Sequence, residues 1–233
     1  MLRPQWHFLS DEPPADIVEL LLLQRGLTGA ERDTFMQPSL AQLHDPFALL
    51  DMEAAVTKLE WALTWQQPVT VFGDYDCDGV TSTVLLYTLL QKAGLQVDYH
   101  VPHRIDDGYG LTSDGVEKVH ARGSRLIVTV DNGIAATEAI EKANVLGMEV
   151  IVTDHHKQEG ELPPACAVVN PNRKDNEYPF QGIAGVGVAY KLCCALAPRI
   201  LSSDEARSFL QEALDLVTLG TVADMMPLID ENR

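Results

Sequence analysis

The sequence predicts a doubly wound α/β fold, in which a mainly parallel five-stranded sheet carries helices on both faces. Short, continuously apolar stretches recur from Val69 onward, which is typical of strands buried on both faces. Stretches with helical periodicity separate these strands, as the crossovers between parallel strands require. Within the 233 residues we find no low-complexity tract and no repeat longer than this strand–helix unit.

The individual elements follow from this alternation. We expect strands at 69–73, 97–101, 125–130, 149–153 and 166–169. We expect the helices of the sheet domain at 80–93, 112–122, 135–146, 185–197 and 204–219.

A helical N-terminal appendage is expected before the first strand. Helical periodicity predicts short helices at 17–25 and 28–35 and a longer helix at 51–66. The preceding segment, 1–15, contains three prolines and is expected to be irregular. We therefore divide the chain into an appendage, 1–66, packed on the core, and a main domain, 67–233.

Composition limits the classes of function. The formal net charge is −17, which argues against a broad electrostatic grip on nucleic acid, because phosphate binding needs clustered Lys and Arg. A local site in which bound metal ions supply the positive charge remains open. The four cysteines show neither a metal-binding spacing nor the density of a secreted scaffold. Without a signal peptide or an apolar stretch of membrane-spanning length, we expect a cytoplasmic protein that does not associate with membranes.

Three carboxylates lie at alternate positions in the turn after the first expected strand: Asp74, Asp76 and Asp78. Three charges this close repel one another unless something neutralises them. Divalent cations with oxygen ligands, Mg²⁺ or Mn²⁺, would do so. The alternative is a capped helix start with solvated carboxylates.

Metal-ligating residue types also follow three later apolar segments. The strand at 125–130 leads into Asp131, the strand at 149–153 into Asp154-His155-His156, and the apolar segment 217–223 into Asp224. Strand ends of a parallel sheet share one edge, so these groups are expected to meet the first carboxylates there. Each Asp taken singly could instead be a helix cap.

Such a set of groups suits a two-metal site. Two divalent ions about 3.5–4 Å apart need a bridging carboxylate, and together they activate a water and hold a phosphoryl group. Asp131 is the expected bridge, because its strand is expected to be central. His155 would add a nitrogen ligand, which favours Mn²⁺ over Mg²⁺. His156 points elsewhere in an extended segment and suits a substrate phosphate, with a supporting or helix-capping role as the alternative.

These motifs resemble those of a known family. Asp74-Tyr75-Asp76-Cys77-Asp78-Gly79, Asp131-Asn132-Gly133, Asp154-His155-His156 and Val222-Ala223-Asp224 are similar to the four motifs of the DHH phosphoesterase superfamily. The pattern is most similar to its branch of single-stranded-DNA-specific exonucleases, the RecJ type. Further similar segments are Pro102-His103-Arg104, Asp107-Gly108-Tyr109-Gly110-Leu111, Asn170-Pro171-Asn172, Gly185-Val186-Gly187-Val188-Ala189, Ala223-Asp224-Met225-Met226-Pro227-Leu228 and Glu231-Asn232-Arg233.

The resemblance implies two Mn²⁺ or Mg²⁺ ions per active site. It assigns Asp76 and Asp131 to one ion, and His156 to the substrate phosphate. It assigns a larger set to the other ion: Asp78, Asp131, His155 and Asp224. Asp74 occupies a motif position, and whether it binds a metal directly is left open.

The resemblance also implies an activity and partners. The expected reaction is stepwise 5′-to-3′ release of mononucleotides from the 5′ end of single-stranded DNA, in DNA repair and recombination. A single-strand-binding protein or a helicase is the expected partner of the full-length enzyme, and a monomer is the expected state. Exonucleases of this type continue into a DHH-associated domain and an OB domain, so we expect this chain to be the catalytic lobe alone.

Three residues outside the metal cluster are candidates for binding substrate. Arg104 could grip a phosphate, or pair with Asp106 or Asp107. Tyr109 could stack on a base, or be a plain turn aromatic. Gly185 precedes a helix whose amides could receive an anion, although close helix packing would also explain a glycine there.

Two other functions remain open at this point. The metal motifs alone do not exclude a hydrolase of short oligonucleotides, cyclic dinucleotides or pyrophosphate. A catalytically inactive DHH module that binds a partner is the non-enzymatic alternative. The intact ligand set argues against that second alternative.

Overall fold

The computed structural model describes residues 16–105 and 108–233. The irregular lead-in expected at 1–15 lies outside these residues. The described chain falls into two compact units, one of residues 44–232 and one that ends at Leu43 and also includes Arg233. The second unit contains α1 (Ile17–Gln24), α2 (Gly29–Met36) and the 3₁₀ turn η1 (Leu40–Gln42). None of the helices among the described residues has the length and apolarity needed to cross a membrane.

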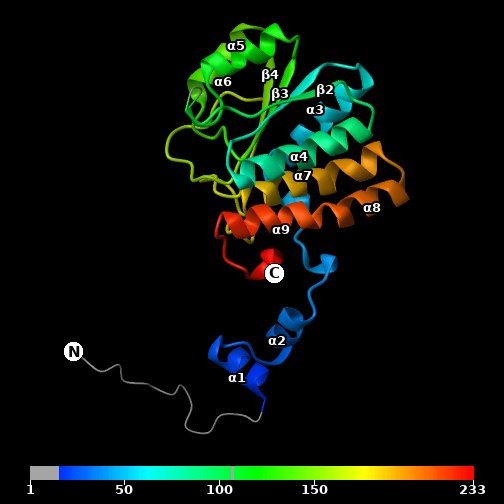
Figure 1. Ribbon diagram of the computed structural model, residues 1–233, viewed down its shortest axis with the longest axis vertical. Coiled ribbons are helices and arrows are strands. Elements are labelled where there is room, and N and C mark those ends of the chain that lie inside the picture. The colour runs from blue at the N-terminus through cyan, green and yellow to red at the C-terminus, as the bar shows by residue number, and fades with distance from the viewer. Residues whose placement is uncertain (1–15, 106–107) are drawn as a thin grey trace, which may run out of the picture. The chain divides into compact units, whose positions relative to one another are not determined.

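The larger unit is built on a five-stranded, fully parallel sheet with the strand order β2-β1-β3-β4-β5 (Figure 1). The strands are β1 (Val69–Phe72), β2 (Val97–His100), β3 (Leu126–Val130), β4 (Glu149–Thr153) and β5 (Ala167–Val169). Every expected strand is present, and β3 lies at the centre of the sheet, as predicted for the strand that precedes Asp131.

Helices cover both faces of this sheet, which confirms the doubly wound α/β prediction. On one face, α5 (Ser113–Ala121) and α6 (Thr137–Val145) pack side by side. Their apolar side chains join those of the strands in one buried cluster that includes Phe72, Ile127 and Val150. Period-two alternation along the strands sends the intervening side chains to the opposite face.

The opposite face carries three helices: α3 (Met52–Thr64), α4 (Cys77–Lys92) and α7 (Gly185–Ile200) (Figure 1). α7 packs against both α3 and α4, and α3 also contacts β5. The 3₁₀ turns η2 (Pro46–Ala48) and η3 (Asp230–Asn232) complete this unit. Most of α7 is buried. Its first residues, Gly185 and Val186, lie beside Asp78, at the edge of the sheet where the strands end.

The single helix predicted at 204–219 is wrong. The structure has two helices there, α8 (Ser203–Glu212) and α9 (Leu214–Ala223), which meet at Ala213. The helix is interrupted at Ala213, which keeps helical φ and ψ angles of −64° and −20°. α9 packs closely on α4, where a Cβ on Gly220 would lie 2.6 Å from Thr81 Oγ1. As a result Asp224 follows a helix, whereas Asp131 and Asp154 follow strands.

α4 begins three residues earlier than predicted. Asp76 is its N-cap, and the Asp76 carboxylate accepts a hydrogen bond from the N–H of Gly79 at 2.9 Å. This cap satisfies one of the free amides of the first turn. Asp78 therefore lies inside that turn and is directed by the helix, while Asp74 belongs to the loop after β1.

Candidate metal centre

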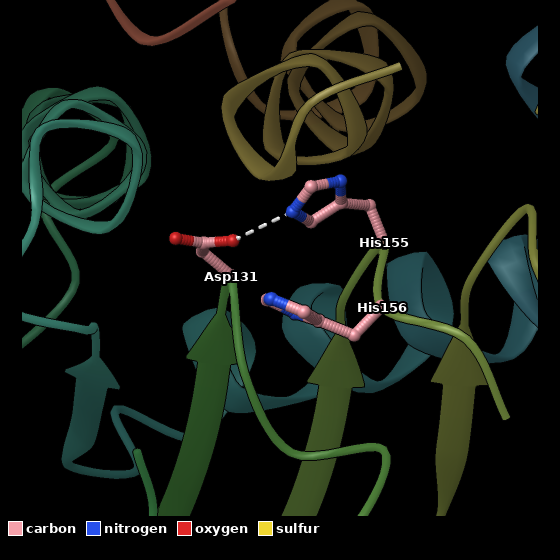
Figure 2. Close-up of side chains that lie close together, drawn as sticks. All are labelled: Asp131, His155 and His156. Atoms are coloured by element: carbon pink, nitrogen blue, oxygen red, sulfur yellow. Dashed lines mark ion pairs between the residues drawn. The ribbon is translucent and has the colours of Figure 1, made fainter. Parts of the chain in front are cut away.

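Four elements bring four of the predicted ligands together. Asp131 directly follows β3, His155 follows β4, Asp78 lies in the first turn of α4, and Asp224 ends α9. His155 Nε2 lies 3.1 Å from Asp131 Oδ1 (Figure 2). The same nitrogen is 3.7 Å from Asp78 Oδ2 and 3.7 Å from Asp224 Oδ2. The imidazole of His155 therefore lies among three carboxylates from separate parts of the chain.

A second acidic group adjoins the first. One oxygen from each of Asp74, Asp76 and Asp131 lies within 4.8 Å of the others. A further group of the same size combines Asp131 with His155 and His156. Asp131 thus stands between the cluster of Asp78, His155 and Asp224 and the cluster of Asp74 and Asp76.

Burial makes this concentration of charge costly. Asp131 is buried, and its burial, followed by the charges of Asp78 and Asp76, raises its pKa to about 10. Its backbone is in the left-handed region, with φ of 62°, a conformation that Asp tolerates better than most residues. Removing the repulsion requires either protons or cations among these carboxylates.

Asp74 is the most buried member of the site, with none of its surface exposed. Neither of its carboxylate oxygens makes a hydrogen bond of standard geometry within the described part of the chain. Burial raises the pKa of Asp74, and the charge of Asp76 adds to the effect. The backbone amides of Tyr75 and Gly110 only partly offset the cost of this burial, and a cation held with Asp76 and Asp131 would offset the rest.

The N-terminus of α7 holds Asp78. The N–H groups of Gly185 and Val186 donate to Asp78 Oδ2 and Oδ1 at 2.6 and 2.8 Å. Burial still raises the pKa of Asp78, against these hydrogen bonds. Gly185 is needed for a second reason, because a Cβ there would lie 2.5 Å from Asp131 Oδ1. The Gly185 amide thus already binds a carboxylate of the site, and its predicted role in substrate binding stays a prediction.

Asp154 organises both histidines. Its Oδ1 accepts the backbone N–H groups of His155 and His156 at 2.7 and 3.1 Å, and its Oδ2 accepts the N–H of Ile134 at 2.9 Å. His156 Nδ1 lies 2.7 Å from the same Oδ1. Burial is the largest single influence and would raise the pKa of Asp154, but the hydrogen bond and charge of His156 and the backbone N–H groups of Ile134 and His156 together outweigh it, so the pKa is lowered. The same bond raises the pKa of His156.

Asp154 is a site residue without a predicted role, although its position after a buried strand in a three-residue motif was the available signal. Asp154 holds the backbone of both histidines and the ring of His156. Figure 2 shows the rings of His155 and His156 both extending toward Asp131 from the same loop, with the dashed contact made by His155.

The candidate substrate residues lie around His156. Tyr109 Oη is 3.1 Å from His156 Nε2, and its ring meets that of Tyr75 edge to face at 6.3 Å. The guanidinium of Arg104 lies 5.3 Å from the Tyr75 ring centre. The alternative partners of Arg104, Asp106 and Asp107, are outside the described residues. A cavity of about 540 Å³ opens beside His156 and Tyr109.

The donor set fits divalent metal ions. Carboxylate oxygens predominate, which suits Mg²⁺ and Mn²⁺, and the imidazole nitrogen favours Mn²⁺. Both buried oxygens of Asp74 and the buried Oδ1 of Asp131, which faces His155 Nε2, make no hydrogen bond of standard geometry to the described residues, and a cation would satisfy them. Asp131 could serve two ions at once, because it belongs to both acidic groups.

Proteins of one known family are similar to this chain over most of its length. Residues 68–221 match the model of the DHH family, N-terminal domain. The chain belongs to the DHH family. Among curated DHH relatives, it is 41% identical over 218 residues to the single-stranded-DNA-specific exonuclease RecJ of Bacillus subtilis. It is 42% identical over 227 residues to RecJ of Escherichia coli.

These DHH relatives are much longer than this chain. The two alignments cover 93% and 94% of this chain, but only 27% of the Bacillus subtilis protein and 39% of the Escherichia coli protein.

Two solved DHH structures share the fold. Exonuclease RecJ bound to manganese superposes with a TM-score of 0.72 at 36% identity, covering 84% of this chain and 47% of that chain. RecJ of Thermus thermophilus in complex with Mn²⁺ gives a TM-score of 0.72 at 33% identity, covering 91% of this chain and 29% of that chain. The α/β architecture described above is therefore that of the DHH domain in RecJ structures.

Proposed function

We propose that this chain is the catalytic lobe of a metal-dependent exonuclease that hydrolyses single-stranded DNA from its 5′ end and releases 5′-mononucleotides. The observation that carries the proposal is the position of Asp131 between two groups of metal-ligating side chains. The similarity to RecJ exonucleases, two of them solved with manganese, supports the substrate class and the metal.

The proposal assigns the ligands as follows. Asp76 and Asp131 hold one Mn²⁺ or Mg²⁺ ion, with the buried carboxylate of Asp74 beside them. The second ion is held by Asp78, Asp131, His155 and Asp224. When bound, such a pair of ions lowers the pKa of a water molecule and stabilises the charge that develops on a phosphoryl group.

The remaining side chains act on the substrate. His156 presents Nε2 at the edge of the cluster, and its bond to Asp154 favours the protonated ring, which can donate to a phosphate oxygen. Asp154 keeps that ring oriented through Nδ1. Arg104 and Tyr109, which lie next to His156 and Tyr75, are proposed to contact the DNA backbone and a base.

The proposal extends to organisation and setting. Residues 67–233 form the phosphoesterase domain and residues 1–66 an appendage, of which α3 packs on α7 and β5. A cytoplasmic monomer that works with a single-strand-binding protein or a helicase fits a role in DNA repair and recombination. The net charge of −17 argues against a broad electrostatic grip on DNA by this chain itself.

Degradation of 5′-phosphorylated single-stranded DNA with Mn²⁺ tests the proposal. Wild-type protein should release mononucleotides, and Asp131→Asn should reduce the rate at least about 100-fold, because it removes the shared ligand. Asp98→Asn, which removes one exposed charge on β2, is the matched control and should act like wild type.

The other function classes are outcomes of the same experiment. Faster turnover of cyclic dinucleotides, dinucleotides or pyrophosphate than of single-stranded DNA would reassign the substrate. Equal rates for wild type and Asp131→Asn would refute the assignment of the site.

A further inference from the structure

The loop after β5 contains the segment Asn170-Pro171-Asn172, to which the proposed function assigns no role. It begins directly after Val169, the last residue of β5. Asn170 has no exposed surface, and Asn172 is partly buried. A fully buried amide side chain outside regular structure needs hydrogen-bond partners within the protein, so its partners indicate its structural role.

Both asparagines donate to the backbone of the metal-site histidines. Asn170 Nδ2 donates to the carbonyl oxygen of His156 at 2.9 Å. Asn172 Nδ2 donates to the carbonyl oxygen of His155 at 2.5 Å. Asn170 Oδ1 accepts the N–H of Asn172 at 2.6 Å, which fixes the two asparagines relative to each other.

These bonds complete the support of the two histidines. The segment after β4 has no helical or strand hydrogen bonds of its own at His155 and His156. Their N–H groups are held by Asp154, and their carbonyls by Asn172 and Asn170. The backbone of each of the two residues is thus fixed at both its donor and its acceptor, which sets the point from which its ring extends.

The asparagine loop is itself anchored on the sheet. The buried guanidinium of Arg173 donates to the carbonyl oxygen of Val168 in β5 at 2.7 Å, and to Asp51 at 2.7 Å. Asp51 also accepts the N–H of Val168 at 3.0 Å. The position of Asn172 is therefore tied to β5, the strand next to the one that delivers the histidines.

We propose that Asn170 and Asn172 are positioning residues, which fix the backbone of the two histidines and thereby aim His155 at the metal site. The proposal rests on the proposed function, because it assumes that His155 binds a metal. Neither asparagine touches the reacting atoms. Both act through the histidines, as outer hydrogen-bonding partners do at other metal sites.

Direct Mn²⁺ binding, measured by titration calorimetry, tests the proposal without any need for DNA. Asn172→Ala should weaken Mn²⁺ binding about tenfold or more, the usual cost of losing an outer partner of a metal ligand. Asn170→Ala should also weaken it, because it removes both the bond to His156 and the bond that orients Asn172. Asn176→Ala is the matched control, since Asn176 lies in the same loop and donates to the carbonyl of Pro171. It should bind Mn²⁺ within about twofold of wild type.

A double-mutant cycle separates positioning from general destabilisation. In a His155→Ala background, the further change Asn172→Ala should leave the residual Mn²⁺ affinity unchanged, because the residue through which Asn172 acts is gone. An effect of Asn172→Ala that is as large with His155 as without it would overturn the proposal. Asn172→Leu, which fills a similar volume and donates nothing, provides the same test if the alanine variant does not fold.

Mn²⁺ binding by the wild type and by Asn172→Ala distinguishes failure of the metal assignment from failure of the positioning role. If wild type binds no Mn²⁺, the metal assignment of the proposed function is wrong, and the positioning role falls with it. If wild type binds Mn²⁺ and Asn172→Ala binds it equally well, only the positioning role is wrong.

Discussion

Gly185 offers a sharp test of the site, because its substitution should disturb metal binding without removing a ligand. A Cβ at this position would lie 2.5 Å from Asp131 Oδ1 and 2.6 Å from Asp131 Cβ. Carbon and oxygen atoms prefer separations nearer about 3.5 Å, so Gly185→Ala must displace the carboxylate or the start of α7 by several tenths of an ångström.

The size of the effect follows from two opposing terms. Gly185 has no positive φ angle, and replacing a helical glycine by alanine otherwise stabilises a protein by about 0.5–1 kcal/mol. Overpacking in a buried site costs about 1–3 kcal/mol. Metal ligands must stay within about 0.2 Å of their proper distances, so the displacement should lower Mn²⁺ affinity about 100-fold.

Titration calorimetry with Mn²⁺ and thermal unfolding of the metal-free protein measure the two effects. Gly187→Ala is the matched control, since it lies two residues further along α7 and its Cβ would approach only Ile183, at 3.3 Å. The control should bind Mn²⁺ like wild type and unfold at the same or a slightly higher temperature. Wild-type affinity in Gly185→Ala would refute the placement of α7 against Asp131.

Three further predictions follow from the structure. The pKa of Asp131, raised by burial to about 10, lies above its unfolded value of about 3.9, so the stability of metal-free wild type should fall as pH rises between these values. Asp131→Asn should flatten that fall in urea titrations at pH 5 and 8, and an unchanged pH slope would count against it. Lys191→Met should lower the free energy of unfolding by about 3–5 kcal/mol, because it strips the buried carboxylate of Glu231 of its ion-pair partner. Replacement of both residues by apolar ones should recover most of this loss. Mn²⁺ at about 100 times its dissociation constant should stabilise wild type by about 2.7 kcal/mol, and a chelator should reverse the gain.

The sheet and the meeting of Asp131 and His155 at its edge could be predicted because their signals are local. Each strand is a short apolar run, and Asp131 and His155 directly follow such runs, so the edge at which they meet follows from parallel topology. The central position of β3, which places Asp131 in several groups of metal-ligating side chains, also follows from that topology. The position of Asp131 between two groups of acidic side chains was therefore predicted from the order of the strands and not from any property of Asp131 alone.

The path to Asp224 could not be predicted in the same way. The interruption at Ala213 has helical backbone angles and involves no glycine or proline, so no local signal marks it. Beyond it, Gly220 packs against Thr81 on α4, a contact between segments far apart in the sequence. Tertiary packing of this kind can override local helical periodicity. The helix predicted at 204–219 is therefore two helices, α8 and α9, in the structure.

The supporting residues were missed for a related reason. Asn170 and Asn172 look like turn formers in a proline-containing loop, which is a sufficient local explanation for them. Their donors reach the carbonyls of His155 and His156 only because β5 lies beside β4. Asp154 was visible as a motif member, but its bonds to Ile134 and both histidines appear only in three dimensions.

Anomalous diffraction at the manganese edge, from crystals of this chain soaked in Mn²⁺, tests the central claim most directly. We predict two manganese peaks that share the carboxylate of Asp131, one beside Asp76 and one beside His155. A single peak that Asp131 does not contact, or peaks only at other acidic surfaces, would contradict the account.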